Sequence, residues 1–418
     1  AIDRLASLAL VLEVALGLRV AAADVVQWLT QRRGTLCLFP DADIYWHLAG
    51  TIRRGEPFQV VLWGDIPHFA LRTPGYPLFL AFCQSVFGES TLAARLVQAL
   101  IGAGSVWLVF RLTRALVREP EPASRWTTPL LAAALAAIDP YYTGTSALLL
   151  SEAVFIPLLL LSLWGLAVLW GQGESATPRA RFGWALVVGA ASGLAVLVRP
   201  SWALGVPALL AAWVVGSGLG RRALIGALVV ALAAALVMGP WWLRNERVFG
   251  RFVPTALWMG ASLYDGLNPK ATGASNMDFL NEPDIWPLGE EGQDAILRER
   301  ALAFARAHPR RVLALAGIKV LRYWSPWPSA SEVRSPVLAV LCGAWSVPLY
   351  ALWLAGLWDR RRDARALVLL AGPLVYFCLL HMVFAGSMRY RIPGEVPALG
   401  LAAIGLRRVC GVRETSRI

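Results

Sequence analysis

The chain has 418 residues, of which 57% are hydrophobic and only 16% are charged, and its formal net charge is +12. A soluble domain has about 25% charged residues, and several apolar runs here are too long for a soluble core. The positive charge does not indicate nucleic acid, because the arginines gather between the apolar runs, where anionic lipid lies. The sequence therefore predicts an all-α polytopic membrane protein that contacts membrane lipids and no nucleic acid.

Ten apolar runs are predicted to span the membrane, and two shorter ones, 76–87 and 312–324, are predicted to be half-length helices at its outer face. The ten predicted spans are residues 5–26, 92–117, 127–142, 147–170, 182–198, 202–216, 223–243, 336–358, 366–384 and 393–406. We therefore expect about 10 to 12 transmembrane or half-length helices.

Two long polar stretches, 27–75 and 244–311, are predicted to be loops that carry short helices. The short connections between the other runs are rich in arginine, and they share one side of the membrane if neither half-length helix spans it. Short basic loops face the cytoplasm, so we expect both long loops on the extracytoplasmic face of the inner or plasma membrane. Residues 1–408 then form one transmembrane domain, and residues 409–418 form a cytoplasmic tail.

Three ionisable residues, Glu13, Arg19 and Asp24, interrupt the first apolar run. Such residues inside a span are expected to face protein or water rather than lipid. The run has no convincing cleavage site, so we interpret it as a retained helix.

Acidic residues near the outer face are the first candidates for catalysis. Asp41 and Asp43 open the first loop, and Glu152 lies at the outer end of a long span. Carboxylates two residues apart on a helix point in different directions, so one could be a general base while the other caps the helix. The alternative is that both are solvated cap residues. Asp139, which precedes a proline, is expected to end a helix.

Five arginines next to prolines or aromatic residues reach the same predicted face. They are Arg72, Arg199, Arg244, Arg389 and Arg391. Arginine binds phosphate through a bidentate fork, so this set suits a lipid-linked phosphate. The alternative is that each arginine snorkels to the membrane interface.

The histidines, His47, His68, His308 and His381, show no HExxH or HxxxH spacing. His47 and His68 share the first loop with the acids, so a divalent-metal site of Asp and His stays open as an alternative. The five cysteines are scattered and show no CxxC motif, so no disulfide or metal framework is predicted. No cofactor is predicted beyond that metal alternative.

Six short motifs occur in order along the chain: PDADIYWHLA, RTPGYPLFLA followed by FGES, LLLSEAVF, LVRP, PWWLRN and RYRIPGEVPAL. Together they resemble the polyprenyl-phosphate-sugar-dependent glycosyltransferases of the C superfamily, in the branch of protein O-mannosyltransferases and lipid A aminoarabinose transferases. The resemblance covers essentially the whole chain.

This resemblance implies roles for the acids. The family's catalytic base precedes a tyrosine by four residues, as Asp41 precedes Tyr45, so Asp41 ranks before Asp43. Glu152 matches the family's second acid. The chain departs from the family pattern at Ala42, which follows Asp41 where an Asp-Glu pair is expected.

The resemblance also implies donor-phosphate binding by Arg72, Arg199, Arg244 and Arg389, and we add Arg391 from the same motif. Leu71 precedes Arg72 where the family often has an acidic residue. The aromatic and amide side chains in the same motifs are expected to line the substrate cavity. They are Tyr45, Tyr76, Trp241, Asn245 and Tyr390.

The implied activity is inverting transfer of a sugar from a polyprenyl-phosphate donor to an acceptor, which is a lipid, a glycan or a protein. A non-enzymatic transporter or flippase of a lipid-linked anionic substrate is one alternative, and a polysaccharide polymerase or ligase is another. A transporter would place ionisable residues at mid-membrane and in repeats. Here they gather at the outer ends of spans and in loops, which favours the enzyme.

The predicted topology is testable by cysteine labelling. A cysteine placed at position 41 should react with a membrane-impermeant thiol reagent added from outside the cell, because the first loop is expected to be extracytoplasmic. Labelling of this position only after the membrane is opened would contradict the proposed arrangement of loops.

Overall fold

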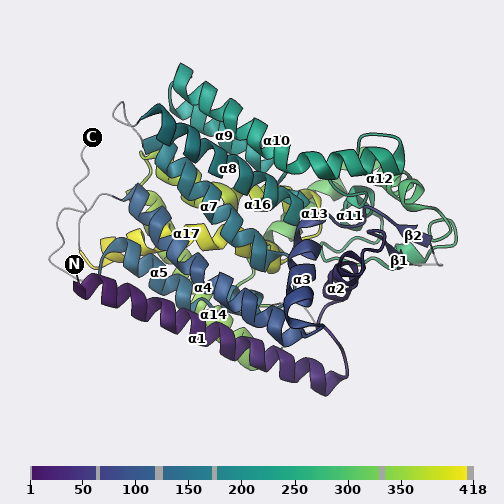
Figure 1. Ribbon diagram of the computed structural model, residues 1–418, viewed down its shortest axis with the longest axis horizontal. Coiled ribbons are helices and arrows are strands. Elements are labelled where there is room, and N and C mark those ends of the chain that lie inside the picture. Colours follow the sequence, from purple (N-terminus) through teal and green to yellow (C-terminus); the bar gives the residue numbers. More distant parts are fainter. Residues whose placement is uncertain (1, 63–65, 118–125, 172–176, 329–334, 412–418) are drawn as a thin grey trace.

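The computed structural model describes residues 2–62, 66–117, 126–171, 177–328 and 335–411, and helices dominate these ranges (Figure 1). Seven helices within them are long and apolar enough to cross a membrane. They are α1 (Ile2–Arg33), α4 (Thr91–Leu116), α7 (Glu152–Gly171), α8 (Pro178–Val198), α10 (Arg221–Phe249), α14 (Pro336–Asp359) and the continuous segment Ala364–Val383. The chain is therefore an all-α, multi-pass membrane protein, as the sequence predicts.

Three of the ten predicted spans differ from simple long apolar helices. Residues 127–142 divide into α5 (Thr128–Ile138) and α6 (Pro140–Ala147). Pro140 lacks the N–H that would continue α5, and Asp139 caps α6 by accepting a hydrogen bond from the backbone N–H of Tyr142 at 2.9 Å. Asp139 therefore ends one helix and begins the next, as expected from its position before a proline.

The other two are the predicted spans 202–216 and 393–406. The first consists of a 3-10 turn, η1 (Pro200–Trp202), and the 12-residue α9 (Gly205–Gly216), which is too short to cross a bilayer core of about 30 Å. The second is α17 (Ile392–Val409), which carries three charged side chains and is surrounded by other helices.

The central helix of the bundle is α17 (Figure 1). Every residue from Ile392 to Gly405 is buried, and the helix packs against α14, α5 and α16 (Gly372–Val383). Two glycines allow the closest of these approaches. A Cβ atom on Gly405 would lie 2.0 Å from the carbonyl oxygen of Leu352, and one on Gly356 would lie 2.0 Å from that of Leu401.

The segment before α16 continues the same membrane crossing. It consists of α15 (Ala364–Ala366) and a π-helical turn, η4 (Leu367–Ala371), in the element order of the chain. The turn η5 (Met388–Arg391) then connects α16 to α17.

The first long loop is ordered around two short helices, α2 (Pro40–Arg53) and α3 (Gly75–Phe87), which pack against each other. Pro40 occupies the first turn of α2 with Asp41 and Asp43, a composition that suits a helix N-terminus. Between the helices, β1 (Val60–Leu62) and β2 (Ile66–His68) pair as antiparallel strands. With 13 residues α3 is too short to span, as predicted for the first half-length helix.

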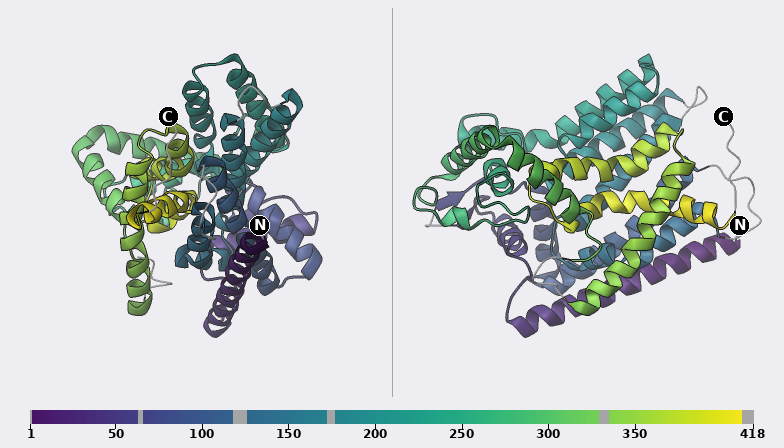
Figure 2. Two further views of the ribbon diagram at one scale, coloured as in Figure 1. Left: turned by 90° about the vertical axis from the view of Figure 1, so that its left-hand side faces the viewer. Right: turned by 180° about the vertical axis from the view of Figure 1, so that it is seen from behind.

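The second long loop folds over the same end of the bundle. It contains α11 (Met259–Gly266), the turn η2 (Asp278–Asn281) and α12 (Glu290–Ala307), and the half-length α13 (Pro309–Tyr323) follows it. A small separate core, which includes Phe279, Ile285 and Leu297, stabilises it. Figures 1 and 2 show both loops gathered at one end of the bundle, while α1 begins at the opposite end. We call the end that carries both loops the loop end.

The charged residues of α1 take two different positions. Arg19 is fully buried and donates hydrogen bonds to the carbonyl oxygens of Ala136 and Ala137, at 3.0 and 3.2 Å, in the last turn of α5. A cation at a helix C-terminus is favourable, so Arg19 faces protein as expected. Glu13 and Asp24 are exposed on the surface of this chain, and their position relative to lipid stays a prediction.

Parts of the predicted cytoplasmic side lie outside the described residues. These are the tail from residue 412 onward and the basic connection 118–125.

The close packing of α17 predicts a sharp difference between glycines. Gly405→Ala should lower the free energy of unfolding by roughly 1–3 kcal/mol, because its Cβ would overlap a backbone oxygen of α14. Gly104→Ala in α4, where no atom lies within 4 Å of the new Cβ, should change it by less than about 1 kcal/mol. Thermal unfolding in detergent measures both, and equal effects would contradict this packing.

Candidate active site

Five charged side chains form a continuous set of ion pairs, which we call the ion-pair cluster. Its members are Asp41, Arg72, Glu152, Arg199 and Arg389. Asp41 Oδ1 lies 2.8 Å from Arg72 Nη2, and Asp41 Oδ2 lies 3.6 Å from Arg389 Nη1. Glu152 Oε1 lies 2.6 Å from Arg389 Nε and 3.0 Å from Arg199 Nη1. Three arginines and two carboxylates leave the cluster with a formal charge of +1.

Four of the five members stand at or beside the end of a helical element. Asp41 lies in the first turn of α2, and Glu152 is the first residue of α7, where the helix dipole favours a negative charge. Arg199 is the C-terminal cap of α8, directly before Pro200. Arg389 lies in η5, where its backbone N–H donates to Ser387 Oγ at 3.3 Å. The ends of four elements therefore converge on one point.

Burial distinguishes the two carboxylates. The side chain of Glu152 is 0% exposed, whereas that of Asp41 is 43% exposed. Burial would raise the pKa of the Asp41 carboxyl, but the Arg72 and Arg389 guanidinium groups outweigh this effect and lower it. Asp41 is therefore an ionised, accessible carboxylate, and Glu152 is an enclosed anchor for two arginines.

Aromatic rings surround the cluster. The Arg72 guanidinium lies 5.9 Å from the ring of Tyr45 and 5.2 Å from that of Trp258. Tyr45 meets Tyr76 edge to face at 5.0 Å, and the Tyr76 hydroxyl donates to Gln98 Oε1 at 2.6 Å. These contacts place Tyr45 beside the cluster and Tyr76 behind it.

Tyr390 borders the other side of the cluster. The Arg199 guanidinium lies 5.7 Å from the Tyr390 ring, and the imidazole of His381 stacks on the same ring. Trp241 and Asn245 make their contacts elsewhere, because their side chains donate to the carbonyl oxygens of Thr255 and Val253.

Arg244 contacts the first loop rather than the cluster acids. Its guanidinium donates to the carbonyl oxygens of Phe58 at 2.9 Å and Phe69 at 2.8 Å. Glu290, from α12, accepts hydrogen bonds from the N–H groups of Phe69 and Ala70 at 2.7 and 2.9 Å. Arg244 and Glu290 together fix the backbone two to three residues before Arg72.

Arg391 is also committed to the protein interior. It is fully buried, pairs with Glu395 at 2.8 Å and donates to the carbonyl oxygens of Tyr323 and Ser325. Of the five arginines predicted to hold phosphate, three therefore meet at the ion-pair cluster. Phosphate binding by Arg244 and Arg391 stays a prediction without support from their contacts.

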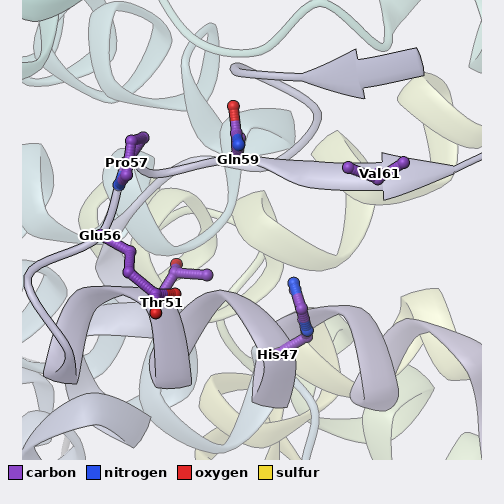
Figure 3. Close-up of a pocket in the computed structure, with 6 residues that line it drawn as sticks. All are labelled: His47, Thr51, Glu56, Pro57, Gln59 and Val61. Carbon is purple, nitrogen blue, oxygen red and sulfur yellow. The ribbon is translucent and has the colours of Figure 1, made fainter. Parts of the chain in front are cut away.

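Asp43 and the first-loop histidines lie apart from the cluster. Asp43 is exposed and makes no salt bridge within the described ranges. His47 lines a surface pocket of about 290 Å³, which Figure 3 shows between α2 and β1, together with Thr51, Glu56, Pro57, Gln59 and Val61. His68 is buried next to Gln293, with 3.3 Å between His68 Nε2 and Gln293 Oε1. The described residues contain no group of three or more His, Cys, Asp or Glu placed to hold a metal ion.

Neither Glu290 nor His381 has a role predicted from the sequence. His381 is an ionisable residue inside an apolar run, the same signal that drew attention to Glu152. Glu290 carries no comparable signal, because a carboxylate at the start of a loop helix is usually a solvated first-turn residue.

Comparisons with known proteins show a family match and a relative over part of the chain. Residues 71–243 match the family model of dolichyl-phosphate-mannose-protein mannosyltransferase. The chain is 31% identical over 199 residues to undecaprenyl phosphate-alpha-4-amino-4-deoxy-L-arabinose arabinosyl transferase 1 of Pseudomonas fluorescens (strain Pf0-1). This alignment covers 45% of the chain and 32% of the relative, so the chain spans about a third of the curated relative that it matches.

Solved structures show the same fold at low sequence identity. The apo oligosaccharyltransferase of Archaeoglobus fulgidus superposes with a TM-score of 0.59 and 16% identity, over 99% of this chain and 53% of that one. The complex of that organism's AglB with an inhibitory peptide and a dolichol-phosphate gives 0.56 and 15%, over 99% and 52%. The family model and the relative agree with the resemblance to polyprenyl-phosphate-sugar-dependent glycosyltransferases over part of the chain, and the solved structures show the fold alone.

The contacts of Glu290 with the first loop predict that the stability of the protein depends on pH. Burial raises the pKa of Glu290 from 4.5 to about 7, against the opposing effect of the two N–H groups and Arg244. The folded state then binds the proton more tightly than the unfolded state, so this stabilisation is present below pH 4.5 and is lost as the pH rises through about 7. The change in unfolding free energy should reach up to about 3 kcal/mol.

Matched variants at Glu290 test this prediction. Glu290→Gln keeps an acceptor for the loop N–H groups and should lose that part of the pH slope in thermal unfolding experiments. Glu290→Ala leaves both N–H groups without their acceptor and should destabilise the protein at every pH by roughly 1–3 kcal/mol. An unchanged slope in Glu290→Gln would show that another group is responsible.

Proposed function

We propose that the chain is an integral membrane glycosyltransferase, which moves a sugar from a polyprenyl-phosphate donor to an acceptor at the extracytoplasmic face. The observation that carries the proposal is the ion-pair cluster, where an accessible carboxylate contacts two arginines at the loop end. The family match and the similarity to an undecaprenyl-phosphate-dependent transferase support the lipid-phosphate donor. The C-terminus is then cytoplasmic, in the inner or plasma membrane.

The donor phosphate would bind where Arg72 and Arg389 now hold Asp41. A polyprenyl-phosphate-linked sugar is a phosphodiester with one negative charge, which equals the formal charge of +1 on the cluster. Guanidinium groups hold phosphate oxygens through paired N–H donors. The two arginines would therefore turn from the carboxylate toward the phosphate, and Asp41 would become a stronger base.

Asp41 then serves as the general base. Its carboxylate takes the proton from the acceptor hydroxyl or amine, whose oxygen or nitrogen forms the new bond to the anomeric carbon. The bond between that carbon and the phosphate oxygen breaks on the opposite face, so the configuration inverts. The lipid leaves as a phosphate with two negative charges while Asp41 is neutral, and the total charge of the site stays constant.

The arginines make this exchange favourable. As negative charge moves from Asp41 to the leaving phosphate, Arg72 and Arg389 remain next to it, and preorganised charges of this kind usually supply the largest catalytic effect. Arg199 and Glu152 contribute indirectly, because the buried Glu152 carboxylate fixes Arg389 at 2.6 Å. The scheme needs no metal ion. The transferred sugar is a hexose or a pentose.

Substitutions of Asp41 separate its two roles. Asp41→Asn should reduce sugar transfer by at least about 100-fold, because the base is lost. It should also bind undecaprenyl phosphate more tightly than the unchanged protein, because the carboxylate no longer competes for Arg72 and Arg389. Product formation in detergent micelles and equilibrium binding of the lipid measure the two effects.

Two further variants serve as controls. Asp43→Asn should retain both activities, because Asp43 makes no ion pair with the described residues. Arg72→Gln should weaken lipid binding. Near-normal transfer by Asp41→Asn would exclude it as the base, and binding of the lipid without any transfer in the unchanged protein would favour a flippase.

A further inference from the structure

His381 is a buried histidine that the proposed reaction does not use. It lies in the last turn of α16 and is 7% exposed. Its Nδ1 atom lies 2.9 Å from the carbonyl oxygen of Ala385. A carbonyl oxygen only accepts hydrogen bonds, so Nδ1 carries the proton and Nε2 presents a lone pair. Nε2 is buried and has no hydrogen-bond partner among the described residues.

The imidazole is one ring away from the ion-pair cluster. Its plane is parallel to the Tyr390 ring, at 2° and 4.1 Å between centroids. Tyr390 directly follows Arg389, which contacts both acids of the cluster, and the Arg199 guanidinium lies 5.7 Å from the Tyr390 ring. The Nε2 lone pair lies in the plane of the imidazole, so the stacked Tyr390 ring covers the face of His381 and not this atom.

The hydrogen bond to Ala385 fixes the tautomer of His381. With the proton on Nδ1, the neutral imidazole has only a lone pair at Nε2. Nε2 therefore acts as a hydrogen-bond acceptor, which suits a hydroxyl or amine donor and does not suit an anionic phosphate.

We propose that Nε2 of His381 accepts a hydrogen bond from a hydroxyl of the lipid-linked sugar, which makes His381 a specificity-determining residue. The inference rests on the proposed function, in which the arginines hold the phosphate to which that sugar is attached. A buried acceptor without a partner is unfavourable, and a sugar hydroxyl in the correct place relieves this cost. Sugars that lack the hydroxyl leave Nε2 unpaired and are rejected.

Three substitutions separate the acceptor from the stacking ring. His381→Phe keeps a ring against Tyr390 and removes both nitrogens. His381→Asn keeps a donor for the Ala385 carbonyl and removes the atom at the Nε2 position. His381→Gln places an amide oxygen near the Nε2 position, so it should restore part of the lost acceptor.

The experiment compares binding of two lipids to the full chain in detergent. One is undecaprenyl phosphate, and the other is the best-bound member of a panel of undecaprenyl-phosphate-linked hexoses and pentoses. All three variants should bind the sugar-free lipid as the unchanged protein does. His381→Asn and His381→Phe should lose roughly tenfold to a hundredfold in affinity for the sugar-bearing lipid, and His381→Gln should lose less.

Three other outcomes would overturn the inference. An equal loss for both lipids would show that His381 only supports the fold, and no loss for either would show that Nε2 does not contact the donor. A raised KM for the acceptor with unchanged donor affinity would assign the hydroxyl to the acceptor. If the unchanged protein binds neither lipid, the proposed function fails first, before His381 is at issue.

Discussion

The site depends on one buried carboxylate held between two arginines. Glu152 is completely enclosed at the start of α7, and a charge in such a place requires opposite charges around it. Arg389 and Arg199 supply them from η5 and from the end of α8. Because η5 leads directly into α17, this carboxylate connects the central helix of the bundle to α7 and α8. Arg389 also reaches Asp41, so the same arrangement includes the first loop.

The second long loop and α13 support the segments that carry Arg72 and Arg389, the two arginines that contact Asp41. Arg244 and Glu290 hold the backbone at Phe69 and Ala70, just before Arg72. On the other side, the buried Lys319 of α13 donates to the carbonyl oxygens of Gly266 and Val383, at 2.9 and 2.7 Å, where the chain leaves α16 toward Arg389. The second long loop and α13 therefore contribute to the geometry of the proposed donor site.

The proposed chemistry follows from competition for the same guanidinium groups. In this structure Arg72 and Arg389 neutralise Asp41, and the phosphate of the donor would take its place. The same two cations that restrain the base before the donor binds would stabilise the leaving phosphate afterwards. A lipid-phosphate donor would then both occupy the site and activate its base, without any charge entering or leaving.

Hydropathy, helix length and prolines act locally along the chain, so the all-α membrane fold, the two long loops, the half-length helices and the candidate acids and arginines were predictable from the residues alone. The sequence left Asp41 and Asp43 nearly equal on physical grounds, and it treated five arginines alike. The folded structure separates the members of both sets. Asp41, Arg72, Arg199 and Arg389 meet around Glu152. Arg244 and Arg391 bind backbone carbonyls elsewhere. The division at Asp139, the burial of α17 and the position of His381 beside Tyr390 were likewise decided by packing. Contacts between residues more than a hundred positions apart depend on how helix ends meet in space, which no local pattern encodes.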